Sequence, residues 1–143
     1  HQQGDVEARV RQAVAVKGLS YVRFAGFQAD EALYYRLFDV FVLATRSGEP
    51  YATSVVQAMM AGKPVVGTAT GGTPELVRDR ETGMLVPPSE PRRMAAALRA
   101  LLDEPGLAER VAAAGRDHVM ANNREEVTTA RVERLYDELA RGR

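Results

Sequence analysis

The sequence predicts an α/β fold in which helices cover both faces of a parallel sheet. Short apolar runs of strand length alternate with longer segments whose apolar residues recur at helical spacing. The run Val40–Leu43 is apolar throughout, which is typical of a strand that is buried on both faces. Strands joined by such helices form right-handed crossovers between parallel neighbours. We therefore expect strand–helix alternation over residues 1–90 and a helical tail over residues 91–143.

Four elements are expected before residue 45. Apolar residues at helical spacing predict a helix over Val6–Val16, which ends before Gly18. The β-rich run Tyr21–Phe24 predicts a first strand. Asp30 stands where the N-cap of a second helix would be, and Val40–Leu43 is the next strand.

Two strands and two helices are expected between residues 45 and 90. A loop leads into the helix Ala52–Ala61, and the buried strand Pro64–Thr68 follows. Two glycines then turn the chain into a short helix, Pro74–Val77, and Gly83–Val86 is the last strand. Two prolines at positions 87 and 88 end this part of the chain.

The tail is predicted to contain three helices, over Pro91–Leu102, Leu107–Met120 and Glu125–Leu139. The sequence contains no internal repeat, no low-complexity tract and no linker long enough to separate two domains. We therefore expect residues 1–143 to form a single, partial domain.

Composition excludes several classes of function. The 143 residues include 19 Lys plus Arg and 19 Asp plus Glu, and this balance argues against a nonspecific nucleic-acid binder. The absence of cysteine excludes disulfides, a thiolate nucleophile and a Cys-ligated zinc site. Asp39 and Asp79 lack the spacing of a metal pair, so no metal site is expected. The sequence has no apolar run of membrane-spanning length and no signal-peptide pattern, which predicts a cytoplasmic location.

The loop from Thr45 to Tyr51 is the candidate ligand site. It joins the carboxyl end of a predicted parallel strand to a helix, the place where open α/β sheets bind ligands. The N–H groups that begin the helix can bind an anion such as a diphosphate. Glu49 precedes these N–H groups, and its carboxylate can accept hydrogen bonds from sugar hydroxyls.

Several segments in the same order resemble one enzyme family. They are Val22–Phe27, Ser47–Tyr51, Ser54–Thr68, Gly71–Val77, Thr82–Pro88, Ala108–Arg116 and Arg131–Leu139. Together they resemble the nucleotide-sugar-binding C-terminal half of GT-B glycosyltransferases, in the large retaining group 1 family. The resemblance implies a Rossmann-like sheet with flanking helices. It also implies that the acceptor-binding domain and the first strands of the donor domain are missing.

The resemblance assigns roles to two groups of residues. In the family, the first glutamate of an E-x7-E pattern faces the donor sugar and the second holds the ribose. Glu49 matches the first and is the candidate catalytic residue, whereas Gln57 replaces the second glutamate. An amide oxygen can still accept a hydrogen bond from a ribose hydroxyl. The other candidate donor-binding residues are Pro50, Tyr51, Ala52, Thr53 and Ser54 beside the diphosphate, and Gly26 and Phe27 beside the base.

The implied reaction transfers a sugar from a UDP-, GDP- or ADP-linked donor to a carbohydrate or lipid acceptor, with retention and without a metal or other cofactor. The acceptor would bind through the missing N-terminal domain, and attachment of the full-length protein to a membrane surface stays open. We expect little activity from this chain alone, because the basic residues that neutralise the diphosphate lie in the missing segment. Arg46 and Lys63 are the nearest basic residues in the sequence. The alternatives are a noncatalytic Rossmann-like binding or assembly domain and a sugar-nucleotide epimerase of the same fold.

The missing strands also predict an exposed sheet edge. In the family's strand order, they would separate Tyr21–Phe24 from Val40–Leu43. Three arrangements would cover the edge: direct pairing of these two runs, pairing or strand exchange with another copy in a homo-oligomer, or pairing with the rest of a longer protein.

Overall fold

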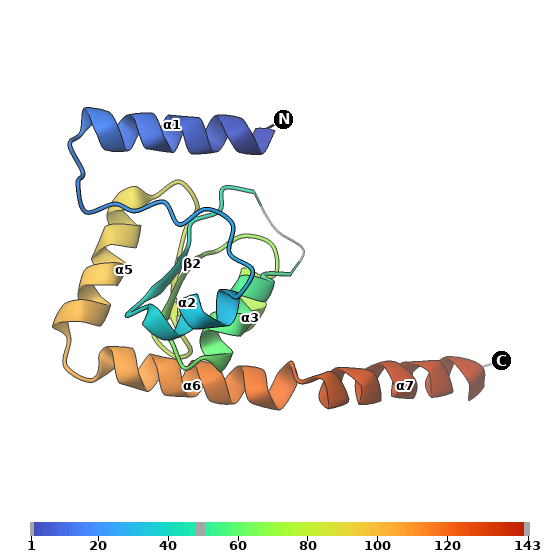
Figure 1. The fold of residues 1–143 in the computed structure, drawn as a ribbon. Coiled ribbons are helices and arrows are strands. Elements are labelled where there is room, and N and C mark those ends of the chain that lie inside the picture. The colour runs from blue at the N-terminus through green and yellow to red at the C-terminus, as the bar shows by residue number, and fades with distance from the viewer. Residues whose placement is uncertain (1, 48–50, 142–143) are drawn as a thin grey trace. The chain divides into compact units, whose positions relative to one another are not determined.

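The computed structural model describes residues 2–47 and 51–141, and the chain forms two compact units that meet between Asp30 and Glu31. The first unit contains helix α1 (Gln2–Val16), followed by a segment without helix or strand (Figure 1). The Arg11 guanidinium lies over the Phe24 ring, 4.1 Å from its centroid, and joins this segment to α1.

The predicted strand Tyr21–Phe24 is therefore wrong. Residues 22–28 are extended chain or coil, and Tyr21 is 77% exposed. A strand is stabilised by hydrogen bonds to a neighbour, and the described part of the first unit contains no second strand. The β-rich composition of this run is therefore not enough to form a strand.

The second unit is built on three parallel strands, β1 (Phe41–Leu43), β2 (Val65–Thr68) and β3 (Met84–Val86). Their order is β1-β2-β3, so that β2 lies in the centre. Phe41 pairs with Val65, and Val66 pairs with Met84. All four residues of β2 are buried, as predicted for Pro64–Thr68. The burial expected for Val40–Leu43 on both faces is wrong, because β1 is an edge strand, its residues are only partly buried and Val42 is exposed. The parallel sheet expected from the sequence is confirmed.

Six helices accompany the sheet, with bounds close to those predicted. They are α2 (Glu31–Leu37), α3 (Thr53–Met60), α4 (Thr73–Leu76), α5 (Pro91–Asp103), α6 (Leu107–Asn122) and α7 (Glu125–Arg141). Helix α3 covers one face of the sheet and α5 covers the other (Figure 1). Two successive valines of β2 contribute to the core on opposite faces of the sheet. Val65 packs with α3, and Val66 packs with α5.

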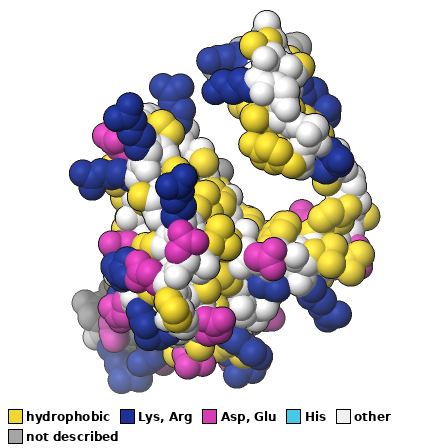
Figure 2. All heavy atoms as spheres, turned by 90° about the vertical axis from the view of Figure 1, so that its left-hand side faces the viewer, with side chains coloured by type: hydrophobic (Ala, Val, Ile, Leu, Met, Phe, Trp, Pro, Cys, Tyr) yellow, Lys and Arg dark blue, Asp and Glu magenta, His cyan; other side chains and the backbone are white. Residues whose placement is uncertain are grey.

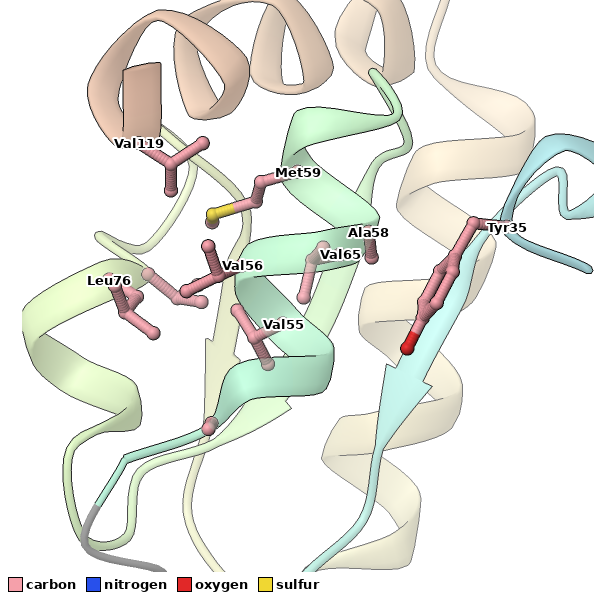
Figure 3. Close-up of a cluster of buried hydrophobic side chains, with 10 residues drawn as sticks. Tyr35, Val55, Val56, Ala58, Met59, Val65, Leu76 and Val119 are labelled. Carbon is pink, nitrogen blue, oxygen red and sulfur yellow. The ribbon is translucent and has the colours of Figure 1, made fainter. Parts of the chain in front are cut away.

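The core on the α3 side ties the last helices to the sheet. Val56, Met59, Leu76 and Val119 point toward one another, and Tyr35 approaches α3 from the side of Ala58 (Figure 3). Met59 is fully buried and Val119 is 1% exposed.

Helix α6 can approach the turn before β3 closely because residue 115 is glycine. A Cβ atom at Gly115 would lie 2.6 Å from the Thr82 carbonyl oxygen. The position therefore admits no larger residue without a shift of the backbone.

The two edges of the sheet differ. At β3, the Leu85 N–H donates to Asp79 Oδ1 at 2.9 Å, so a side chain accepts the hydrogen bond of this backbone N–H. At β1, no strand among the described residues pairs with the outer side, and Val42 is 39% exposed. Direct pairing of Tyr21–Phe24 with β1 is excluded, because Tyr21–Phe24 forms no strand. An open edge at β1 is what the sequence predicts.

The surface is mixed in charge, and helix α7 is solvated. On the face shown in Figure 2, basic and acidic side chains lie interspersed among hydrophobic ones. None of the residues of α7 is buried. Within residues 2–47 and 51–141, the structure contains no helix with the length and apolar character needed to cross a membrane.

Candidate functional site

Three threonine hydroxyls tie the carboxyl ends of β1 and β2 together. The Thr45 N–H donates to Thr68 Oγ1 at 3.1 Å, and the Thr68 hydroxyl donates to the Thr45 carbonyl oxygen at 2.9 Å. The hydroxyls of Thr45 and Thr70 are 3.0 Å apart. Thr68 is only 4% exposed, so these bonds are largely shielded from water. They fix the start of the loop that leaves β1.

A hollow of about 190 Å³ opens at this same edge of the sheet. It is lined by Ala44, Thr45, Arg46, Thr68, Pro87, Ser89, Glu90, Pro91 and Met94. The lining residues come from the carboxyl ends of all three strands and from the start of α5. This is the edge at which open α/β sheets bind ligands.

The structure separates the two basic residues that the sequence left unassigned. Arg46 follows β1 and lines the hollow. Lys63 precedes β2 and therefore lies at the opposite end of the sheet, where its Nζ donates to the Arg36 carbonyl oxygen at 2.8 Å. Of these two cations, Arg46 is the one placed to meet an anion at the carboxyl ends of the strands.

The predicted diphosphate segment is described only in part. Glu49 and Pro50 lie outside the described residues. Ala52 is the N-cap of α3 and is fully buried, so neither its side chain nor its backbone is at the surface. The cap lacks a side-chain hydrogen bond, whereas the Thr53 N–H donates to the Tyr51 carbonyl oxygen at 3.0 Å. Of the predicted anion-binding N–H groups, that of Thr53 is therefore already engaged.

The side chains of this segment diverge. Tyr51 is 47% exposed, and its hydroxyl accepts a hydrogen bond from the Asn123 amide at the end of α6. Thr53 is exposed and Ser54 is partly exposed on the first turn of α3. The Tyr51 side chain therefore contacts the end of α6. The side chains of Thr53 and Ser54 are the ones exposed at the start of α3.

Gln57 lies on the exposed side of α3 and contacts α2. The Tyr35 hydroxyl donates to Gln57 Oε1 at 3.0 Å. A second hollow, of about 370 Å³, lies beside this contact and is lined by Ala32, Tyr35, Arg36, Gln57, Met60 and Ala61. Tyr35 was not predicted as a site residue, because the contact joins residues 22 positions apart and no local pattern indicates it.

Gly26 and Phe27 belong to the first unit, whereas Tyr51–Gln57 belong to the second. Gly26 has a φ of +68°, and Phe27 is 92% exposed. Their predicted place beside the base stays a prediction. In the described part of the chain, no group of three or more His, Cys, Asp and Glu side chains could hold a metal ion.

The family follows from comparison with known proteins. The model of the family "Glycosyl transferases group 1" matches residues 3–104, which is most of the chain. The chain belongs to this family.

Three of its relatives and structural neighbours have about three times its length. It is 34% identical over 139 residues to the phosphatidyl-myo-inositol mannosyltransferase of Mycobacterium leprae, covering 96% of this chain and 36% of the relative. Sucrose-phosphate synthase from Thermosynechococcus elongatus superposes with a TM-score of 0.83 at 31% identity, covering 95% of this chain and 35% of that one. Anabaena Alr3699/HepE in complex with UDP-glucose superposes with a TM-score of 0.82 at 27% identity, covering 96% and 37%. These likenesses confirm the predicted fold, and the chain spans about a third of their length.

The threonines that hold this edge of the sheet together were not among the predicted site residues. A threonine two residues after the end of each of two neighbouring strands, Thr45 after β1 and Thr70 after β2, is the signal that could have found them. Such positions lie together at the carboxyl edge of any parallel sheet.

We predict that Thr68→Val destabilises this edge. Valine has nearly the same shape but leaves the Thr45 N–H without its acceptor, at a cost of about 1–3 kcal/mol in the free energy of unfolding. Urea denaturation measures the loss, and hydrogen exchange should show reduced protection of the Thr45 amide. The control is Thr129→Val on the exposed face of α7. Equal stability of the two variants would show that the threonine network contributes nothing.

Proposed function

We propose that this chain is the donor-binding part of a glycosyltransferase that moves a sugar from a nucleoside diphosphate to a carbohydrate or lipid acceptor. The observation that carries the proposal is the carboxyl edge of the parallel sheet, where a hollow opens and helix α3 begins without a side-chain cap. The chain belongs to the group 1 family. The solved structure of Anabaena Alr3699/HepE with UDP-glucose supports the same class of donor.

In this proposal, each part of the donor has its own partner. The backbone N–H groups at the start of α3, other than that of Thr53, meet the diphosphate, because a helix N-terminus favours negative charge. Arg46, at the same edge, adds a positive charge. Gln57 holds the ribose, the backbone at Gly26 and Phe27 flanks the base, and Glu49 orients the sugar hydroxyls. Binding requires neither a metal nor another cofactor.

We expect donor binding to depend on Glu49. In a thermal-shift screen with UDP-, GDP- and ADP-glucose, one donor should raise the melting temperature of the chain in the presence of EDTA. Glu49→Ala should abolish most of this shift, because it removes the acceptor for the sugar hydroxyls. The control is Glu133→Ala on the exposed helix α7.

The result also separates the classes of function. A sugar-nucleotide site predicts that the free nucleoside diphosphate still binds the Glu49→Ala variant, since the diphosphate and ribose contacts remain. A noncatalytic assembly domain predicts no shift with any donor, or the same shift in both variants.

We propose that the 143-residue chain alone binds the donor without turning it over. The developing charge on the leaving diphosphate needs several preorganised donors, and Arg46 is the basic residue that lines the hollow at this edge. A coupled assay for nucleotide release, with simple sugars as acceptors, should show no turnover above background. Turnover near that of a full-length group 1 enzyme would contradict the proposal.

We further propose that the outer side of β1 is covered by another strand, which in the isolated chain comes from a second copy. The edge is apolar and Val42 is 39% exposed, a combination that favours pairing between chains. Light scattering should show association at micromolar concentrations, and Val42→Lys should make the chain monomeric. The control, Val132→Lys on α7, should leave association unchanged. A wild-type chain that stays monomeric, with rapidly exchanging β1 amides, would exclude this arrangement.

A further inference from the structure

The ring of Tyr35 is held rigidly by its neighbours. It is 8% exposed and forms a triangle with two phenylalanine rings, with centroids 5.8 Å from Phe38, 5.8 Å from Phe41 and 6.0 Å between the two phenylalanines. The first pair meets edge to face at 81°, and the second is tilted at 43°. Because Phe41 is the first residue of β1, the ring position is tied to the sheet. These contacts hold the phenol ring, and with it the hydroxyl, in place beside α3.

That hydroxyl is directed at Gln57. It donates to Gln57 Oε1 at 3.0 Å across the gap between α2 and α3. Burial raises the pKa of Tyr35, and the negative charge of Glu31 raises it further, so the hydroxyl keeps its proton at neutral pH. In the structure this proton is donated to the oxygen end of the Gln57 amide.

The contact decides which end of the amide is turned outward. In a glutamine side chain, the oxygen and the NH₂ group lie on opposite sides of the same carbon. When Oε1 faces Tyr35, the NH₂ group is directed away from it. Gln57 is on the exposed side of α3, so this group is presented at the surface.

We propose that Tyr35 is a positioning residue for the nucleotide ribose, acting through Gln57. It holds the amide so that Gln57 donates a hydrogen bond to a ribose hydroxyl oxygen, whereas a glutamate at this position would accept one. The inference rests on the proposed function, because it assumes that the chain binds a nucleoside diphosphate. It adds a residue to the site and reverses the direction of the expected hydrogen bond.

The test compares nucleotides with and without ribose hydroxyls by titration calorimetry. The probe is whichever of UDP, GDP and ADP binds the wild-type chain most tightly, paired with its 2′,3′-dideoxy form. Tyr35→Phe keeps the ring and removes only the hydroxyl. It should weaken binding of the ribonucleotide by about threefold to tenfold and leave binding of the dideoxynucleotide unchanged. Tyr34→Phe, which removes a phenol hydroxyl from the next position on α2, is the matched control and should change neither.

A second pair of variants separates positioning from packing. In a Gln57→Ala background, Tyr35→Phe should have no further effect on the ribonucleotide, because its partner is gone. In the free wild-type chain, the NH₂ resonances of Gln57 should move on Tyr35→Phe and not on Tyr34→Phe. Gln57→Met serves as the reference for complete loss of the ribose preference, since it removes the amide itself whatever the role of Tyr35.

The outcomes distinguish the two proposals. If no nucleoside diphosphate binds the wild-type chain, both the proposed function and this inference are overturned. If the wild-type chain prefers the ribonucleotide but Tyr35→Phe binds both probes normally, donor binding stands and the role of Tyr35 is excluded. Equal losses for the ribo and dideoxy probes would show a structural role and would also overturn the inference.

Discussion

The central position of β2 is the constraint on which the rest of the second unit depends. Its residues face both layers of helices, Val65 on the α3 side and Val66 on the α5 side, and all four are buried. A strand with no polar face can be stable only between two neighbours and beneath helices on both sides. Parallel pairing with β1 and β3 then places three carboxyl ends at one edge. The hollow and the start of α3 lie at this edge because of that arrangement.

Hydrogen bonds and aromatic packing both hold β1 in place. Among the described residues, this strand has a neighbouring strand on one side only. The Thr45–Thr68 bonds hold its carboxyl end, and the contact between Phe41 and Tyr35 holds its beginning. A three-residue edge strand contributes few ladder bonds of its own. These side-chain contacts therefore have a larger share in holding β1 than they would in a central strand.

The sequence predicted those parts of the fold that local patterns specify. Apolar runs such as Val40–Leu43 and the helical spacing of α5 have a period that can be recognised without knowledge of the neighbours. The run Tyr21–Phe24 shows the limit, because strand formation depends on a partner that the first unit does not supply. Long-range contacts could not be predicted for the same reason. The Tyr35–Gln57 bond and the Thr45–Thr68 bonds join residues more than twenty positions apart.

Helix α3 unites the two parts of the proposed donor site. Thr53 and Gln57 are four residues apart, so they lie on one side of the helix, about 6 Å apart along its axis. The start of the helix favours negative charge because its N–H dipoles point outward. One turn later these dipoles no longer act, so a side chain is needed to form hydrogen bonds with a neutral sugar. A glutamate there would place a negative charge one turn from a bound diphosphate. Glutamine avoids that repulsion, but its amide has two unlike ends, and a fixed hydroxyl such as that of Tyr35 is what makes one orientation prevail.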